Sequence, residues 1–208
     1  MNKRTAVAVS SVLLAVAALL AMGPILAGAA PTQDAAWLTG WDYRKKISIV
    51  SGQVSGTLSN FPVVIELSGD SDLSTHAQAG GEDIRLTSSD GTTLLDYERV
   101  SYSSGDLELW FEATTITDGS EFYLYYGNAL ASDGENATGV WPSEFEAVYH
   151  LGESSGSTAF DSTGNAHDGT YNGSLPDATA AQVGMGQSGV EGSADDVQIG
   201  DEAELEWM

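Results

Sequence analysis

A tryptophan between two glutamates is the first group of side chains in this sequence that could bind a ligand. If residues 107–112 form a β-strand, its period of two places Trp110 on the same face as Glu108 and Glu112. Sugar rings stack their C–H faces on aromatic planes, and nearby carboxylates accept the hydroxyl hydrogens. The pattern predicts a carbohydrate-binding platform. The sequence favours the alternative, a Trp packed beneath a loop or a second module, because a buried Trp commonly anchors a β-sandwich.

Two tyrosines on a later segment form a second aromatic pair. Alternation over residues 122–126 puts Tyr123 and Tyr125 on one face, opposite Phe122, Leu124 and Tyr126. The pair is a further candidate for ligand contact, and cross-strand aromatic packing is its favoured alternative role.

The many acids of the chain do not form a convincing catalytic pair. Glu108 and Glu112 are separated by about 13 Å along a strand, which exceeds the separation of about 5 to 10 Å that glycoside hydrolysis requires. Glu204 and Glu206 fit that distance but lie among a general excess of acids. Cysteine is absent, and the sequence has neither a Gly-x-Ser-x-Gly nucleophile elbow nor a phosphate-binding loop. We expect a protein without catalytic activity.

One turn-rich loop places three oxygen ligands close together in the sequence. Asp161, Asn165 and Asp168 could bind Ca²⁺, although their spacing differs from that of an EF-hand. The favoured alternative is a solvated loop of Asx turns, which Asp and Asn form unaided. The three histidines lack the spacing of a zinc site: His76, His150 and His167.

Two short motifs are acceptor sequences for N-glycosylation in an exported protein. They begin at Asn136 and Asn172, and both fall in expected loops.

The elements that would position these side chains are short strands separated by Gly, Ser, Asp and Asn turns. Expected strands cover residues 46–49, 61–67, 83–86, 93–97, 107–112 and 122–126. Ser89-Asp90-Gly91 is a hairpin turn signal, and Pro62 indicates an edge strand or a strand start. The sequence predicts an all-β fold, with one antiparallel β-sandwich domain over residues 38–141.

A second module begins after Trp141-Pro142, where the composition changes. Residues 144–151 alternate as a strand would, and weak strands are expected at 183–186 and 196–199. Only 66 residues remain from Ser143, whereas a two-sheet sandwich needs about 100 residues. We expect residues 143–208 to be the first part of an incomplete jelly-roll β-sandwich, and the chain to be a fragment of a longer surface protein.

The charge of the 208-residue chain limits its partners. Lys and Arg number 7 against 30 Asp and Glu, for a formal net charge of -23, so a nucleic-acid partner is excluded by repulsion. A hydrophobic fraction of 42% is enough for a packed core. Dense carboxylates are typical of a salt-adapted, halophilic surface, with calcium recruitment as the alternative. An exported protein without cysteine fits a bacterial or archaeal envelope better than a eukaryotic secretory pathway.

The N-terminus has the pattern of an export signal. A basic start at Lys3-Arg4 precedes an apolar run from Ala6 to Ala30, and Ala27-Gly28-Ala29 suits signal peptidase. We expect residues 1–29 to be a cleaved signal peptide, which places the protein outside the cell or at its surface. An uncleaved membrane anchor is the first alternative, because the run is long enough to span a bilayer. A prepilin-type signal is the second.

An ordered set of short motifs resembles an uncharacterised domain family of archaeal and bacterial envelope proteins. The motifs are Trp41-x-Tyr43-Arg44-Lys45-Lys46-Ile47, Leu58-x-x-Phe61-Pro62-Val63, Gly81-x-Asp83-Ile84-Arg85, Asp90-Gly91, Leu94, Tyr97-Glu98, Trp110 and Leu124-Tyr125-Tyr126-Gly127-Asn128. The family has no established catalytic residues, so the resemblance implies none here.

The segment that follows is similar to the opening of a concanavalin A-like or laminin G-like jelly roll. The similarity rests on Val148-Tyr149-His150-Leu151-x-Glu153, Asp161-Ser162-Thr163-Gly164-Asn165 and Gly169-Thr170. Jelly rolls of the laminin G type often bind Ca²⁺, so the resemblance implies calcium as the candidate cofactor.

Together these features predict an exported, non-catalytic module of a cell-envelope protein. Its expected partner is a glycan or a cell-surface protein, through carbohydrate binding or adhesion, and it contacts a membrane only if the N-terminal segment is retained. The alternatives are a structural spacer or assembly subunit, and an accessory region of a polysaccharide-degrading enzyme.

Overall fold

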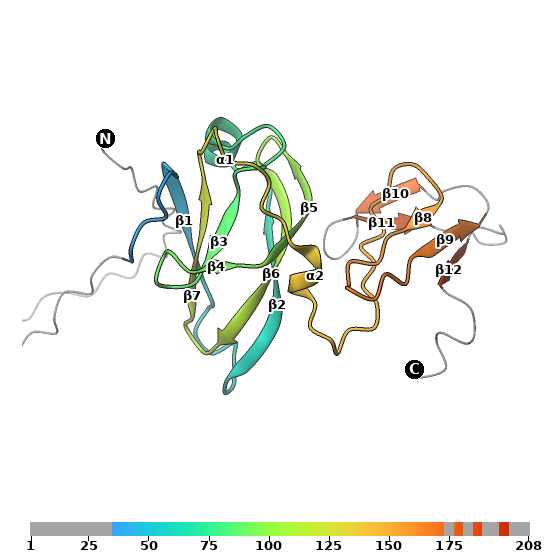
Figure 1. Ribbon diagram of the computed structural model, residues 1–208, viewed down its shortest axis with the longest axis horizontal. Helices are drawn as coiled ribbons and strands as arrows, with labels where there is room; N and C mark the ends of the chain where they lie inside the picture. The colour runs from blue at the N-terminus through green and yellow to red at the C-terminus, as the bar shows by residue number, and fades with distance from the viewer. Residues whose placement is uncertain (1–34, 173–176, 181–184, 189–195, 200–208) are drawn as a thin grey trace, which may run out of the picture.

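The computed structural model describes residues 35–172 and the three strands at 177–180, 185–188 and 196–199 (Figure 1). The predicted signal peptide over residues 1–29 lies outside the described residues, as do Gly173 and Ser174 of the second glycosylation motif and the pair Glu204 and Glu206.

Two antiparallel sheets face each other in the first part of the chain (Figure 1). The first sheet has the strand order β1-β7-β3-β4, with β1 at Tyr43–Ser48, β7 at Glu121–Tyr126, β3 at Arg85–Thr87 and β4 at Leu94–Leu95. The second has the order β2-β6-β5, with β2 at Leu58–Leu67, β6 at Asp106–Ile116 and β5 at Tyr97–Ser103. The predicted all-β sandwich is confirmed.

The core of the sandwich is built from the inward faces of the strands that alternate most clearly. Leu109 and Phe111 of β6 are fully buried, and so is Leu124 of β7. Aromatic packing between Phe111 and Phe122 joins the two sheets at a ring separation of 5.1 Å. The sequence therefore identified the inward faces of β6 and β7 correctly.

Two local predictions are also confirmed. Leu86 pairs with Leu95 across the hairpin that turns at Gly91, where the φ angle is 78°. Strand β2 is an edge of its sheet and carries Pro62 opposite Glu112, as the proline indicated.

Asp83 joins two motifs that are distant in the sequence. Its carboxylate is fully buried. Oδ2 accepts hydrogen bonds from the backbone N–H groups of Gly127 and Asn128, at 2.6 and 3.0 Å, and Oδ1 accepts one from Gln78 at 2.9 Å. These contacts fix the chain where it leaves β7.

Within the residues that the structure describes, two short helices occur that the sequence did not predict. Helix α1 covers Ser71–His76. It is capped at its N-terminus by Asp70, whose side chain accepts hydrogen bonds from two backbone N–H groups of the first turn. Helix α2 covers Ala137–Val140. No helix in the described part of the chain is both long and apolar enough to cross a membrane.

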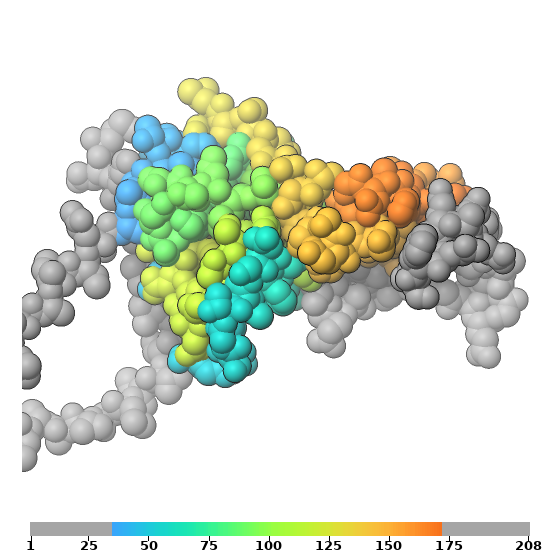
Figure 2. Space-filling model, turned by 60° about the horizontal axis from the view of Figure 1, so that its bottom comes forward, coloured from blue at the N-terminus to red at the C-terminus, as the bar shows by residue number. Residues whose placement is uncertain are grey.

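The second part of the chain forms two smaller sheets. Strands β8 at Thr158–Ala159, β9 at Gly169–Asn172 and β12 at Asp196–Ile199 are ordered β12-β9-β8, and β10 at Asp177–Ala180 pairs with β11 at Met185–Ser188. In the space-filling view, the yellow-to-orange residues of this part lie directly against the sandwich (Figure 2).

The prediction of a strand at residues 144–151 is wrong. Only an isolated bridge forms there, between Tyr149 and Asp161. Several backbone groups of this stretch bond to side chains instead of to a neighbouring strand. Asn165 donates to the carbonyl of Glu146, and Asp161 accepts from the N–H of Val148. An alternating pattern of side chains was not sufficient to form a strand here, because no neighbouring strand pairs with the backbone of this stretch.

Candidate functional site

The outer face of the β2-β6-β5 sheet carries the side chains that the sequence singled out as a carbohydrate platform. Trp110 is only partly exposed there. Its ring lies 5.3 Å from that of Trp141 and 6.2 Å from that of His150, both of which follow the sandwich in the sequence. Trp110 is therefore packed beneath the following segment, the alternative that the sequence favoured, and does not present an open face to a sugar.

Glu98 is the polar centre of this covered face. It lies on β5 directly opposite Trp110, and 8% of the residue is exposed. Its Oε2 accepts a hydrogen bond from Trp141 Nε1 at 2.8 Å and lies 3.0 Å from His150 Nε2. Its Oε1 accepts one from Ser162 Oγ at 2.6 Å. One carboxylate thus ties the sandwich to three side chains of the following segment.

The contacts of Glu98 decide its charge and the protonation of its neighbours. Burial acts to raise the pKa of Glu98, but hydrogen bonds from His150, Ser162 and Trp141 outweigh it and hold the pKa below its ordinary value. The carboxylate is therefore ionised at neutral pH. Because an ionised carboxylate only accepts hydrogen bonds, the proton of the contact between His150 and Glu98 lies on His150 Nε2.

Glu108 lies on the same face in a less favourable environment. Only 6% of the residue is exposed. Burial raises its pKa, and the carboxylates of Glu66 and Glu98 raise it further. The indole N–H of Trp110 lowers it in part, but that buried group has no partner with hydrogen-bond geometry among the described residues. Glu112, farther along β6, also has a raised pKa, first because of burial and then because of Asp96.

A groove of about 280 Å³ opens where β5 meets the following segment. It is lined by Glu98, Arg99, Val100, His150, Gly152, Glu153, Phe160 and Ser162. Phe160 is 60% exposed, so the groove has an aromatic side chain open to solvent. The Glu153 carboxylate accepts hydrogen bonds from the Phe160 backbone N–H at 3.0 Å and from the Tyr171 hydroxyl at 2.7 Å.

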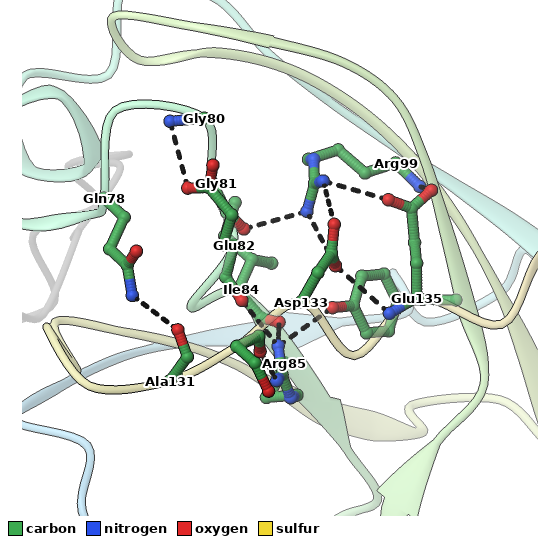
Figure 3. A network of polar contacts seen from close by, with 12 residues as sticks. Gln78, Gly80, Gly81, Glu82, Ile84, Arg85, Arg99, Ala131, Asp133 and Glu135 are labelled. Carbon is green, nitrogen blue, oxygen red and sulfur yellow. Dashed lines mark hydrogen bonds and ion pairs between the residues drawn. The ribbon is translucent and has the colours of Figure 1, made fainter.

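Arg99 is the cation nearest to this groove, and acids already surround it (Figure 3). Its Nη2 lies 2.7 Å from Asp133 Oδ2 and 3.0 Å from Glu135 Oε2, and its Nη1 donates to the Gly81 carbonyl. The hydrogen bond from Arg99 holds the pKa of Asp133 below its ordinary value. The guanidinium charge is therefore neutralised within the protein.

Tyr123 and Tyr125 lie on the outer face of the other sheet, around Arg44. The Arg44 guanidinium carbon lies 4.2 Å from the centre of the Tyr123 ring and 4.4 Å from that of Trp37. Tyr125 is fully buried, and its hydroxyl donates to the Gly91 carbonyl at 2.9 Å. The two tyrosines thus hold Arg44 and residues 36–38 in place, which is a packing role.

The three residues of the predicted calcium loop form hydrogen bonds that stabilise turns of the loop. The two oxygens of Asp161 accept from the N–H groups of Val148, Thr163 and His167 and from the Thr163 hydroxyl. Burial acts to raise the pKa of Asp161, but these bonds lower it overall. Asp168 Oδ1 accepts from the Asp161 N–H, and Asn165 Nδ2 donates to backbone carbonyls. No group of three or more His, Cys, Asp or Glu in the described residues is arranged to hold a metal.

The first predicted glycosylation site, Asn136, is exposed immediately before α2. Its Nδ2 donates a hydrogen bond to Asp96 Oδ1 at 3.0 Å. The side chain of the second site, Asn172, lies outside the described part of the structure.

Glu98, His150 and Phe160 were not among the site residues predicted from sequence. In the sequence, Glu98 is part of the Tyr97-Glu98 motif only, and no motif contains Phe160. Glu98 and the three residues that bond to its carboxylate are spread over positions 98 to 162, and no motif of fixed spacing connects them. Only the folded chain brings them together.

Comparison with known proteins gives one match. The model of a family described as "Domain of unknown function (DUF2341)" matches residues 80–166, which is less than half of the chain. The matched stretch contains Glu98, Trp110, Trp141, His150 and Ser162, and it continues past Trp141 into the segment that covers the sandwich. No curated protein matches. No solved structure matches either.

Proposed function

We propose that the protein is a non-catalytic structural module of the cell envelope, exported by its N-terminal segment, whose sandwich holds the following segment in a fixed orientation. The observation that carries this proposal is the Glu98 carboxylate, which bonds to Trp141, His150 and Ser162. A buried, fully hydrogen-bonded network opposes independent movement of the parts that it joins. A spacer in an envelope needs this property.

The composition supports the location. A net charge of -23 keeps a protein soluble, and screening by salt reduces the self-repulsion that such a charge causes. We propose a secreted or cell-surface protein with a salt-adapted exterior. Sequencing the N-terminus of the protein from the envelope and extracellular fractions tests export. We expect a start at Ala30, and a retained Met1 would contradict cleavage.

NMR relaxation of the mature protein tests the structural role. We expect the amides of β6 and β9 to report one rotational correlation time. Trp141→Ala, which removes the ring over Trp110 and one hydrogen bond to Glu98, is expected to shorten the correlation time of β9 relative to β6. Phe61→Ala, at an exposed side chain on β2, is the control and should change neither value. Independent tumbling of the two parts in the unmodified protein would contradict the proposal.

Glycan binding is the second candidate function. The exposed Phe160, which lines the groove between β5 and the following segment, favours it. Trp110 and Tyr125 do not support it, because Trp141 packs over Trp110 and Tyr125 is fully buried. A glycan array probed with the mature protein, with and without Ca²⁺, tests this role. Retention of no glycan under either condition would rule it out.

We also propose that the residues after Ser143 open a concanavalin A-like jelly roll. The antiparallel order β12-β9-β8 supports this assignment at the level of strand pairing. An experimental structure of this part of the protein tests it. We expect two stacked sheets with jelly-roll connections, and a different strand order would contradict the assignment.

A further inference from the structure

We propose that the groove between β5 and residues 150–162 binds a neutral, hydroxyl-rich saccharide, with Phe160 stacking on the sugar ring and with the Ser162 oxygen accepting a hydroxyl hydrogen. This inference rests on the glycan-binding role proposed above and names its site and the class of its ligand.

The first support is the aromatic side chain at the edge of the groove. Phe160 directly follows β8 and is 60% exposed, although a large apolar ring is normally buried. The hydrogen bond from its N–H to Glu153 fixes its backbone, and Glu153 is held in turn by the Tyr171 hydroxyl. A ring on a fixed backbone can stack on a sugar with little loss of conformational entropy.

The second support is the polarity that Glu98 imposes on the groove. Ser162 uses its hydroxyl hydrogen to bond to Glu98, and His150 uses its Nε2 hydrogen in the same way. The oxygen of Ser162 therefore remains as an acceptor at the groove. An acceptor beside an exposed ring suits a ligand that donates through hydroxyl groups and presents a C–H face.

The third support concerns charge. Glu98 is ionised and Glu153 also lines the groove, whereas the positive charge of Arg99 is neutralised by Asp133 and Glu135. An anionic sugar would meet the carboxylates of Glu98 and Glu153, and the Arg99 guanidinium is already paired with two acids, so we exclude uronic acids and sulfated sugars. The volume of about 280 Å³ is close to the lower end of small-molecule sites, about 300 Å³. It suits a single sugar unit of a longer chain.

The experiment is an NMR titration of the mature protein with free glucose, galactose, mannose, N-acetylglucosamine, glucosamine and glucuronic acid. We expect at least one neutral sugar to shift the amides of His150, Phe160 and Ser162, and glucuronic acid to shift none of them. Phe160→Ala should weaken binding about tenfold, the upper range of a single aromatic contact. Phe160→Tyr should keep it. Phe61→Ala, another exposed phenylalanine on the sandwich, is the matched control and should bind as the unmodified protein does.

The outcomes separate this site from the broader role. If the protein binds a neutral sugar and Phe160→Ala binds it equally well, glycan binding stands but the groove is not the site. If only glucosamine binds, recognition is by charge and the proposed hydroxyl recognition is wrong. If no sugar on the array or in the titration binds, the glycan-binding role and the site both fail. Because Phe160 is on the surface, its substitution should leave the melting temperature within about 2 °C.

Discussion

Substitution of Glu98 by glutamine is the sharpest test of how the sandwich and the following segment are joined. Glutamine has the same shape, but its amide nitrogen is a donor where the carboxylate only accepts. In the structure the two Glu98 oxygens accept from Trp141, His150 and Ser162. At least one of these donors would face the new NH₂ group, and the others would lose a charged partner.

The expected cost is large for a single isosteric change. A hydrogen bond to a charged group contributes about 1.5 to 3 kcal/mol, and removing one partner of a buried charged network typically costs about 3 to 5 kcal/mol. With only 8% of Glu98 exposed, little solvent is present to replace the lost interactions. We expect E98Q to lower the free energy of unfolding by about 3 to 5 kcal/mol at pH 7.

Urea unfolding followed by tryptophan fluorescence measures this change, because Trp141 donates directly to Glu98. The matched control is Glu144→Gln, the same chemical change at an exposed position of the segment that follows the sandwich. We expect the control to stay within about 0.5 kcal/mol of the unmodified protein. Coinciding midpoints for E98Q and E144Q would refute the central role of the Glu98 carboxylate.

The effect must also depend on pH in a defined direction. The pKa of Glu98 is lowered in the folded protein, so its contribution to stability is present above the unfolded pKa, ordinarily about 4.5, and is lost as the pH falls through the folded pKa. The difference between the unmodified protein and E98Q should therefore shrink as the pH decreases below about 4.5. A difference that stays constant from pH 7 to pH 3 would show that the carboxylate charge is not its cause.

Three further substitutions test other parts of the structure by thermal or urea unfolding. Gly91→Ala places a methyl group 1.9 Å from the Ala36 carbonyl oxygen at a φ of 78°, so it should cost more than about 2 kcal/mol. Gly52→Ala has a similar φ and nothing within 4 Å, and an equal loss there would contradict the steric explanation. Arg44→Lys should cost about 2 kcal/mol, because lysine cannot keep the planar stack between two aromatic rings, and a neutral result would show that the stack contributes nothing. Glu108→Gln should stabilise the protein at pH 7 by about 1 kcal/mol, and a loss of stability would contradict the unfavourable burial inferred for this carboxylate.

The predictability of each strand follows from how its two faces differ. Strands β2, β6 and β7 alternate apolar and polar side chains, so the sequence located all three. Strand β5 was missed beyond Tyr97, because Glu98, Arg99 and Ser101 are polar and an irregularity between Arg99 and Ser101 interrupts the alternation. Periodicity identifies a strand with one apolar face, but it fails where both faces are covered and one carries polar groups that bond to another part of the chain.

The same limit applies to the site. Alternation placed Trp110 on the correct face, but it contains no information on what lies above that face. The covering side chains come from positions 141 to 162, and their arrangement depends on turns around Asp161 rather than on a strand. Such turns satisfy backbone groups through side chains, and they leave only a general enrichment in Asp, Asn, Ser and Gly as a signal in the sequence.

Glu98 and Glu108 show why a count of acids cannot reveal which of them matter. They lie on neighbouring strands and are 8% and 6% exposed, yet the sequence pointed to Glu108 as a candidate ligand-binding residue and not to Glu98. Glu98 has three donors and a lowered pKa, whereas burial raises the pKa of Glu108 and the indole N–H of Trp110 lowers it only in part. By linkage, ionised Glu98 stabilises the fold at neutral pH, while the contribution of Glu108 is greatest below its unfolded pKa and is lost as the pH rises through its folded pKa. The same Glu→Gln change should therefore destabilise the protein at one position and stabilise it at the other, and changes of the same sign would show that burial alone, rather than the supply of donors, decides the energy of these carboxylates.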